Sequence, residues 1–203
     1  MKVIFCEGTD DEIFLKRFAN FLNIPLSNFY IKPLSGSVGE EVPLRILKDK
    51  LREGHIHKME KIIFFLDNDH NYFTEYKSKS VFNLIRSEFS IPVIFIKICP
   101  SRDIFYFYNE QITSLLYGKK AWQDVKNLIS KKKAKEIRNI LKAKYKAKIQ
   151  NILNPQSKRS KFRTFYSKIE KHFTPIAEVM KCKKIELNLQ IKVGFAQIEI
   201  ISY

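Results

Sequence analysis

The sequence of 203 residues lacks several features that would assign it to a particular class of protein. Its three cysteines, Cys6, Cys99 and Cys182, show no paired spacing, which argues against a disulfide framework and a zinc site. No apolar run approaches the roughly 18 residues of a membrane-spanning helix. The first apolar run reaches Glu7 too soon for a signal peptide. We therefore expect a soluble, cytoplasmic protein with reduced thiols and no membrane partner.

The composition is that of a folded chain. Apolar residues make up 45% of the sequence, enough to bury a sizeable core. The length predicts one domain, or one domain with an extension. No internal repeat is present, and nothing in the sequence indicates an oligomeric state.

The charge is distributed unevenly along the chain. Residues 1–110 contain 15 Lys and Arg against 15 Asp and Glu, whereas residues 111–203 contain 22 against 6, so the net charge of +16 lies in the second half. Such asymmetry is typical of proteins with a polyanionic partner, most often nucleic acid. An anionic membrane surface is the competing explanation.

Apolar runs and helical periodicities alternate in the first half. We predict strands at 3–6, 29–31, 62–66 and 91–98, and helices at about 9–22, 42–52 and 79–89. Strands separated by helices imply right-handed crossovers and a mostly parallel sheet. The sequence therefore predicts an α/β fold.

Acidic residues follow two of these predicted strands. Glu7 and then Asp11 come after the first, and Asp67 and Asp69 come after the third. Because ligands bind outside the carboxyl ends of parallel strands, we expect these acids to meet in one crevice. Carboxylates gathered in this way indicate a divalent metal site.

A buried strand followed by Glu7-Gly8 and a helix, and later a strand ending in Asp67-x-Asp69, resembles the TOPRIM domain of topoisomerases, primases and small nucleases. Asp11, four residues after Glu7, is similar to the pattern of the overcoming-lysogenization-defect (OLD) nucleases and their small stand-alone relatives. The resemblance covers about residues 1–100. It implies a mostly parallel four-stranded sheet flanked by helices.

The resemblance also implies a role for each acid. Glu7 would be a metal ligand or general acid/base, Asp67 and Asp69 would bind Mg²⁺ or Mn²⁺, and Asp11 would help to hold a second ion. Ions of this kind stabilise the attacking and leaving oxygens of a phosphodiester. Asn71 stands where topoisomerases usually carry a third acid, which favours a nuclease. OLD-type relatives often work with a partner ATPase, and the sequence does not show whether this protein requires one.

Structural explanations remain open for the same residues. Asp11 could simply favour the start of a helix, and Asp67 and Asp69 could end a strand and begin a turn. Asp103 and Glu110 lie where a further acid could join the site, although no motif includes them.

The basic half is expected to be a mainly helical extension, residues 111–203, beside a catalytic domain of residues 1–110. A long basic helix is predicted from about 119 to 153. Beyond it, cations alternate with aromatic rings, as single-stranded nucleic acid favours. The residues that we expect to contact nucleic acid are Lys158, Arg159, Lys161, Arg163, Phe165 and Tyr166. Alternatively, the aromatic residues form the buried stripe of an amphipathic helix.

These patterns predict a magnesium-dependent nuclease that cleaves DNA or RNA. The alternative is a nucleic-acid-binding or adaptor protein on the same scaffold that does not cleave, and a third hypothesis is another phosphoryl-transfer activity on a nucleotide.

Overall fold

A computed structural model of the chain describes residues 1–34, 41–52, 59–67, 83, 85, 87–146, 149, 153–154, 161–181 and 189–202. Among these residues, no helix has the length and apolar character needed to traverse a bilayer. The elements, in chain order, are β1 (Lys2–Cys6), α1 (Thr9–Phe21), η1 (Leu26–Asn28), β2 (Phe29–Pro33), α2 (Glu41–Arg52), β3 (Lys61–Asp67), β4 (Val93–Cys99), η3 (Arg102–Tyr106), α4 (Glu110–Tyr117), α5 (Ala121–Leu128), α6 (Ala134–Lys144), α8 (Lys161–His172), α9 (Thr174–Met180), β5 (Leu189–Val193) and β6 (Ala196–Ser202).

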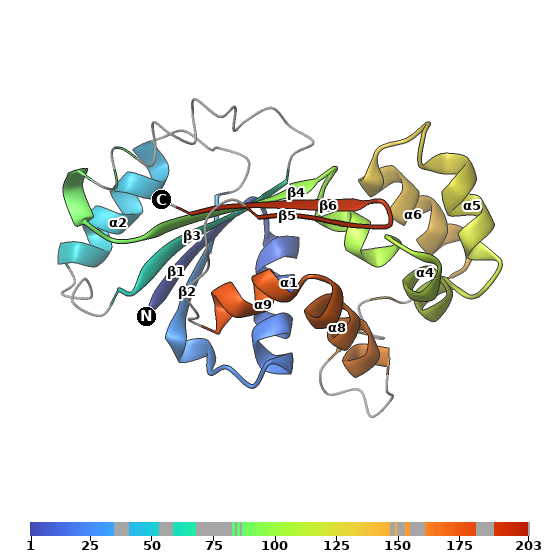
Figure 1. Cartoon of the computed structure of the whole chain (residues 1–203), viewed down its shortest axis with the longest axis horizontal. Coiled ribbons are helices and arrows are strands. Elements are labelled where there is room, and N and C mark those ends of the chain that lie inside the picture. The colour runs from blue at the N-terminus through green and yellow to red at the C-terminus, as the bar shows by residue number, and fades with distance from the viewer. Residues whose placement is uncertain are drawn as a thin grey trace.

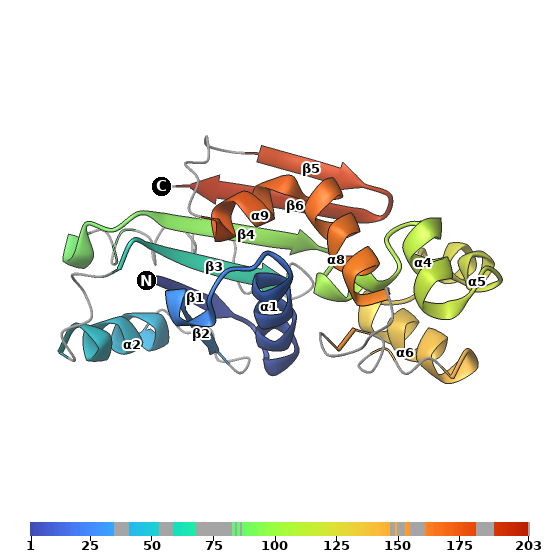
Figure 2. The same cartoon turned by 90° about the horizontal axis from the view of Figure 1, so that it is seen from below.

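The sheet has six strands in the order β2-β1-β3-β4-β6-β5 (Figure 2). As predicted, the strands β1 to β4 pair with one another in parallel. The sheet does not end there, which corrects the expected four strands: β6 pairs antiparallel with β4, and β5 with β6. The reason is that β4 would otherwise expose an unpaired apolar edge, which the alternating C-terminal segment covers. The α/β fold is therefore confirmed, with a mixed sheet.

Apolar runs form the central strands because both faces of the sheet are covered. Along β1, Val3 and Phe5 face one hydrophobic cluster, whereas Ile4 and Cys6 face another. Figure 1 shows the two layers that bury these faces: α2 lies on one side, and α1, α8 and α9 lie on the other. The N-terminal helix, predicted at about 9–22, is confirmed as α1.

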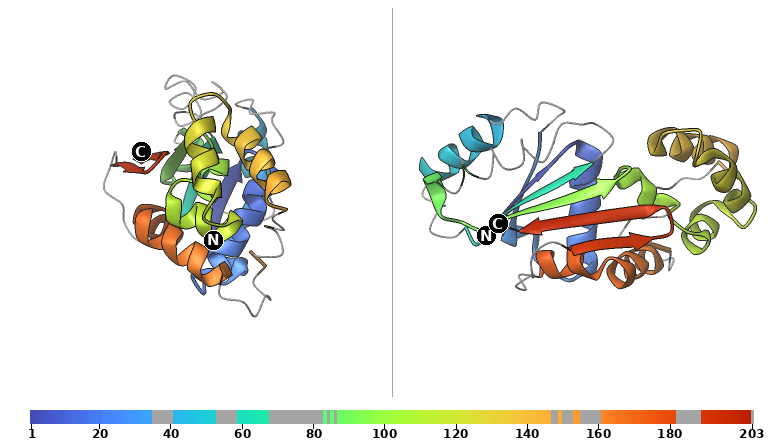
Figure 3. Two further views of the ribbon diagram at one scale, coloured as in Figure 1. Left: turned by 90° about the vertical axis from the view of Figure 1, so that its right-hand side faces the viewer. Right: turned by 45° about the horizontal axis from the view of Figure 1, so that its top comes forward.

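Helices α4 to α6 lie beyond the carboxyl ends of β3 and β4 (Figure 3). The single helix predicted over 119–153 is wrong, because α5 ends at Leu128 and α6 begins at Ala134. A straight helix of that length would extend about 50 Å, with little of its apolar stripe in contact with the core. The break folds α6 against α5, so that Val125 and Ile137 are both fully buried.

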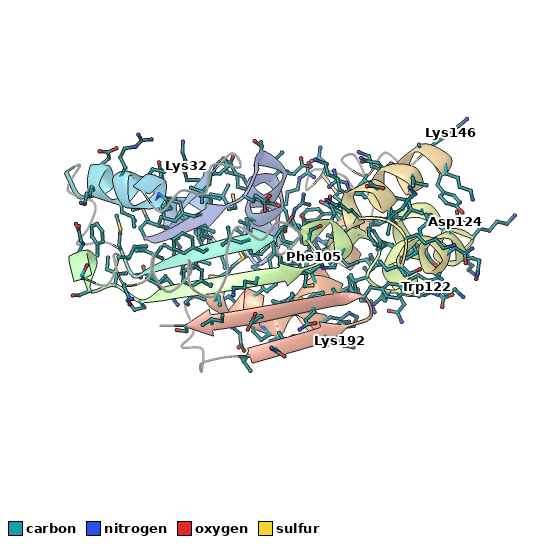
Figure 4. All side chains as sticks on the ribbon, turned by 90° about the horizontal axis from the view of Figure 1, so that it is seen from above. Lys32, Phe105, Trp122, Asp124, Lys146 and Lys192 are labelled. Carbon is teal, nitrogen blue, oxygen red and sulfur yellow. The ribbon has the colours of Figure 1, made fainter. Side chains whose placement is uncertain are left out.

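The C-terminal half belongs to the same hydrophobic core as the first half. The larger buried cluster includes side chains from α1, the sheet, α4 to α6, α8 and α9. Phe105 is fully buried within it, at the point where the sheet meets α4 to α6 (Figure 4). Residues beyond 110 thus supply two strands of the sheet and several of the helices that pack around it.

Candidate functional site

Two of the predicted acids lie at the carboxyl ends of adjacent strands. Strands β1 and β3 are parallel, with Cys6 paired to Phe65. Glu7 directly follows β1, and Asp67 is the last residue of β3. The two residues therefore reach the same edge of the sheet, as the crevice rule for parallel strands predicts.

Asp67 is held in a strongly acidic environment. Burial, followed by the negative charge of Asp11 and that of Glu7, raises the pKa of Asp67 from 3.8 to about 8. The backbone N–H of Arg102 donates a hydrogen bond to Oδ1 of Asp67 (2.7 Å), which lowers the pKa in part. No other described residue donates a hydrogen bond to Asp67. The site therefore carries more negative charge than the protein neutralises.

Asp11, which is buried, is engaged through both of its carboxylate oxygens. The backbone N–H of Gly8 donates to Oδ2 (2.9 Å), and Nε of Arg102 donates to Oδ1. The resemblance gave Asp11 a second metal ion, but here the guanidinium of Arg102 supplies the positive charge. Asp11 thus fixes the turn between β1 and α1 and orients Arg102.

Arg102 contacts four acidic residues, Asp10, Asp11, Asp67 and Asp103, and sequence reasoning missed it. It lies just beyond β4, and its side chain is only 4% exposed. Its Nη2 lies 3.4 Å from Asp103 and 3.8 Å from Asp10. Nη1 donates a hydrogen bond to the hydroxyl of Tyr106 (3.0 Å). The sequence feature that could have identified Arg102 is its position after the fourth parallel strand, which ends at the same edge of the sheet as Glu7.

The remaining acidic candidates divide into three cases. Asp69 lies outside the described residues. Asp103 is buried beside Arg102 and pairs with Arg138, so it acts as a structural partner of two cations. Glu110 is exposed in the first turn of α4.

Glu7 and Asp67 supply two carboxylates at one edge of the sheet, which is the type of donor that a divalent ion takes. Mg²⁺ is commonly held through one or two carboxylates and keeps several waters, and the charge excess at Asp67 is the kind that a cation relieves. Within the described ranges, no three His, Cys, Asp or Glu side chains are grouped so as to hold a metal ion. Any third carboxylate ligand must therefore come from elsewhere in the chain, and Asp69 is the predicted one.

The predicted nucleic-acid contacts on α8 require a correction. Phe165 and Tyr166 are buried, so their rings are not available to stack on bases. The ring of Tyr166 packs 5.7 Å from that of Phe18 in α1, as the buried-stripe alternative implied. Lys161 and Arg163 are exposed on α8. Lys158 and Arg159 lie outside the described residues.

Comparison of the chain with protein-family models, with curated proteins and with solved structures finds no match. The function must therefore be argued from the site.

Proposed function

We propose that this protein is a metal-dependent nuclease that hydrolyses phosphodiester bonds in DNA or RNA, with β1 to β4 forming a TOPRIM-like catalytic core. One observation carries the proposal. Glu7 and Asp67 lie at the ends of adjacent parallel strands, and burial, followed by the negative charges of Asp11 and Glu7, raises the pKa of Asp67 to about 8. Structural acids are usually paired with cations, whereas an uncompensated acid in a crevice is typical of a functional site.

The chain's own residues have distinct roles in this proposal. A Mg²⁺ or Mn²⁺ ion bound by Glu7 and Asp67 would stabilise negative charge on the phosphate oxygens. Glu7 is half-buried, so its carboxylate can accept a proton from an attacking water. Arg102 positions Asp67 through its N–H and Asp11 through its guanidinium. Arg102 also stands where the resemblance would place a second ion.

The charge of the chain supports a nucleic-acid substrate. The net charge of +16 attracts polyanions over a long range, and the acidic site needs such a field to admit a phosphodiester. The proposed hydrolysis is a reaction of this chain alone, so it can be assayed without the partner ATPase with which OLD-type nucleases often work.

A non-catalytic nucleic-acid-binding protein is the second candidate. It is favoured by the absence, in the described part of the chain, of three potential ligands grouped at one place. The two candidates differ in whether Glu7 and Asp67 perform chemistry.

A cleavage assay separates them. End-labelled single-stranded DNA, duplex DNA and RNA are incubated with the protein in Mg²⁺, in Mn²⁺ and in EDTA. We expect cleavage only with metal, and a loss of at least about 100-fold in Glu7→Gln and Asp67→Asn, because each removes a charge at the reacting phosphate. Glu12→Gln is the matched control, since Glu12 pairs with Lys16 on the outside of α1. Equal loss in Glu12→Gln, or no cleavage by the wild type, would contradict the proposal.

A further inference from the structure

A basic hollow lies between α1 and α6, beside the acidic site. Its walls include Asp10 and Arg17 of α1, Tyr106 of η3, and Arg138 and Lys142 of α6. The enclosed part of the hollow measures about 100 Å³, which is smaller than the roughly 300–1,000 Å³ of pockets for drug-sized ligands. Three cations and one acid therefore face a small space that is open to solvent.

The cations of this hollow are of two kinds. Arg138 is fixed by ion pairs with Asp103 and with Asp10, the latter at 3.1 Å. Arg17 and Lys142 form no ion pair with any residue in the described part of the chain. They line the hollow from α1 and from α6, so both positive charges act on an anion that enters it.

The electrostatics of Asp10 indicate how positive this space is. Partial burial by itself would raise the pKa of Asp10. The hydrogen bond from Arg138 and the charges of Arg102 and Lys142 outweigh that effect and lower the pKa. The positive field therefore persists around the only acid among the lining residues.

Arg102 contacts both the acidic site, through its N–H to Asp67, and the lining of the hollow. Arg102 lies 3.8 Å from Asp10 at the edge of the hollow, and it also pairs with Asp11. It donates a hydrogen bond to Tyr106, which lines the hollow. Groups bound in the two places can therefore belong to one polymer strand.

We propose that this hollow binds a backbone phosphate of the nucleic-acid strand whose neighbouring phosphodiester lies at Glu7 and Asp67, with Arg17 and Lys142 as the phosphate ligands. The inference rests on the proposed function and names the surface that holds its substrate. Arg138 and Tyr106 form the fixed part of the hollow, since both are tied to other side chains. This surface replaces the aromatic residues of α8, which are buried.

Binding without cleavage provides the test. A labelled single-stranded oligonucleotide is titrated with wild-type protein and with Arg17→Gln/Lys142→Gln in EDTA at several salt concentrations. We expect Kd to rise at least tenfold, and the slope of log affinity against log salt to become shallower by about 0.7, since the two side chains neutralise one phosphate and each neutralised single-strand phosphate contributes about 0.7.

The matched control is Lys126→Gln/Lys135→Gln, which removes the same charge from exposed positions of α5 and α6 outside the hollow. It is expected to change Kd less than threefold. Equal weakening in both double variants would overturn the inference, because a general field would then explain the binding. Circular dichroism and Tm verify that both variants are folded.

Two further readouts separate this inference from the nuclease proposal. If the wild type cleaves and the Arg17/Lys142 variant binds and cleaves normally, the hollow assignment is wrong and the nuclease proposal stands. If the wild type does not cleave but the variant loses binding, the nuclease proposal is wrong and the assignment of the hollow as a phosphate site stands. Inorganic phosphate alone is the third probe: affinity for it equal to that for the oligonucleotide would indicate a free-phosphate site and contradict a strand site.

Discussion

Replacing Asp67 by Asn should stabilise the metal-free protein increasingly as the pH rises. The pKa of Asp67 is raised to about 8 by burial and by Asp11 and Glu7, whereas an unfolded Asp ionises near 3.9. Between these values the folded state binds one more proton than the unfolded state. The stabilisation of the folded state by the protonated Asp67 is complete below pH 4, falls as the pH rises, and is lost above about 8. Asn keeps an oxygen that accepts the N–H of Arg102.

The magnitude follows from the shift. The free energy of unfolding of the wild type should fall by about 1.4 kcal/mol per pH unit through this one group. Between pH 5.5 and 7.5 that amounts to about 2.7 kcal/mol. Such contributions vary two- to threefold, and the side chain is partly exposed, so we expect Asp67→Asn to gain about 1–3 kcal/mol on the wild type over this interval.

Urea denaturation in EDTA at the two pH values measures this gain. Asp49→Asn, at an exposed position of α2, is the control and should show no pH-dependent gain. Added Mg²⁺ should raise the Tm of the wild type at pH 7.5 but not that of Asp67→Asn, because the ion takes the place of the proton. A stability difference between Asp67→Asn and wild type that is the same at both pH values would refute the reasoning.

Two further substitutions test the surroundings of the site. Arg102→Gln should lower the free energy of unfolding by about 3–5 kcal/mol, because it leaves buried Asp11 without its cation; in urea titrations, adding Asp11→Asn should recover part of the loss, and strict additivity would contradict the pairing. Phe165→Ala should cost about 3–5 kcal/mol because the ring is fully buried, while the folded variant should bind single-stranded oligonucleotide as the wild type does; a loss of affinity would restore the stacking role.

The central strands and the meeting of Glu7 with Asp67 could be predicted because they follow from local patterns. Continuous apolar runs formed β1 and β3, which pair in parallel, and the carboxyl ends of parallel strands share an edge. Helix α1 followed equally from the helical spacing after Gly8, although Gly8 itself, and not Thr9 or Asp10, is its N-cap. These features depend on neighbours in the sequence, so one chain is enough to predict them.

The features that could not be predicted depend on contacts between distant segments. Arg102 becomes the partner of Asp11 only because β4 ends beside β3. The insertion of β6 next to β4 places residues about 100 positions apart in register, such as Ile98 and Ile198. The prediction that Phe165 and Tyr166 stack on bases was wrong, because their helical spacing places both rings in the buried stripe of α8 while the cations at the start of that helix face solvent.

The most direct measurement is the anomalous scattering of a crystal soaked in Mn²⁺. The account predicts an anomalous peak at the carboxyl ends of β1 and β3, within coordination distance of Glu7 and Asp67, and no second peak at Asp11, whose oxygens are held by Arg102 and Gly8. Loss of the peak in Asp67→Asn crystals would strengthen the assignment. A soaked crystal with Mn²⁺ elsewhere on the protein and none at Glu7 and Asp67 would contradict it.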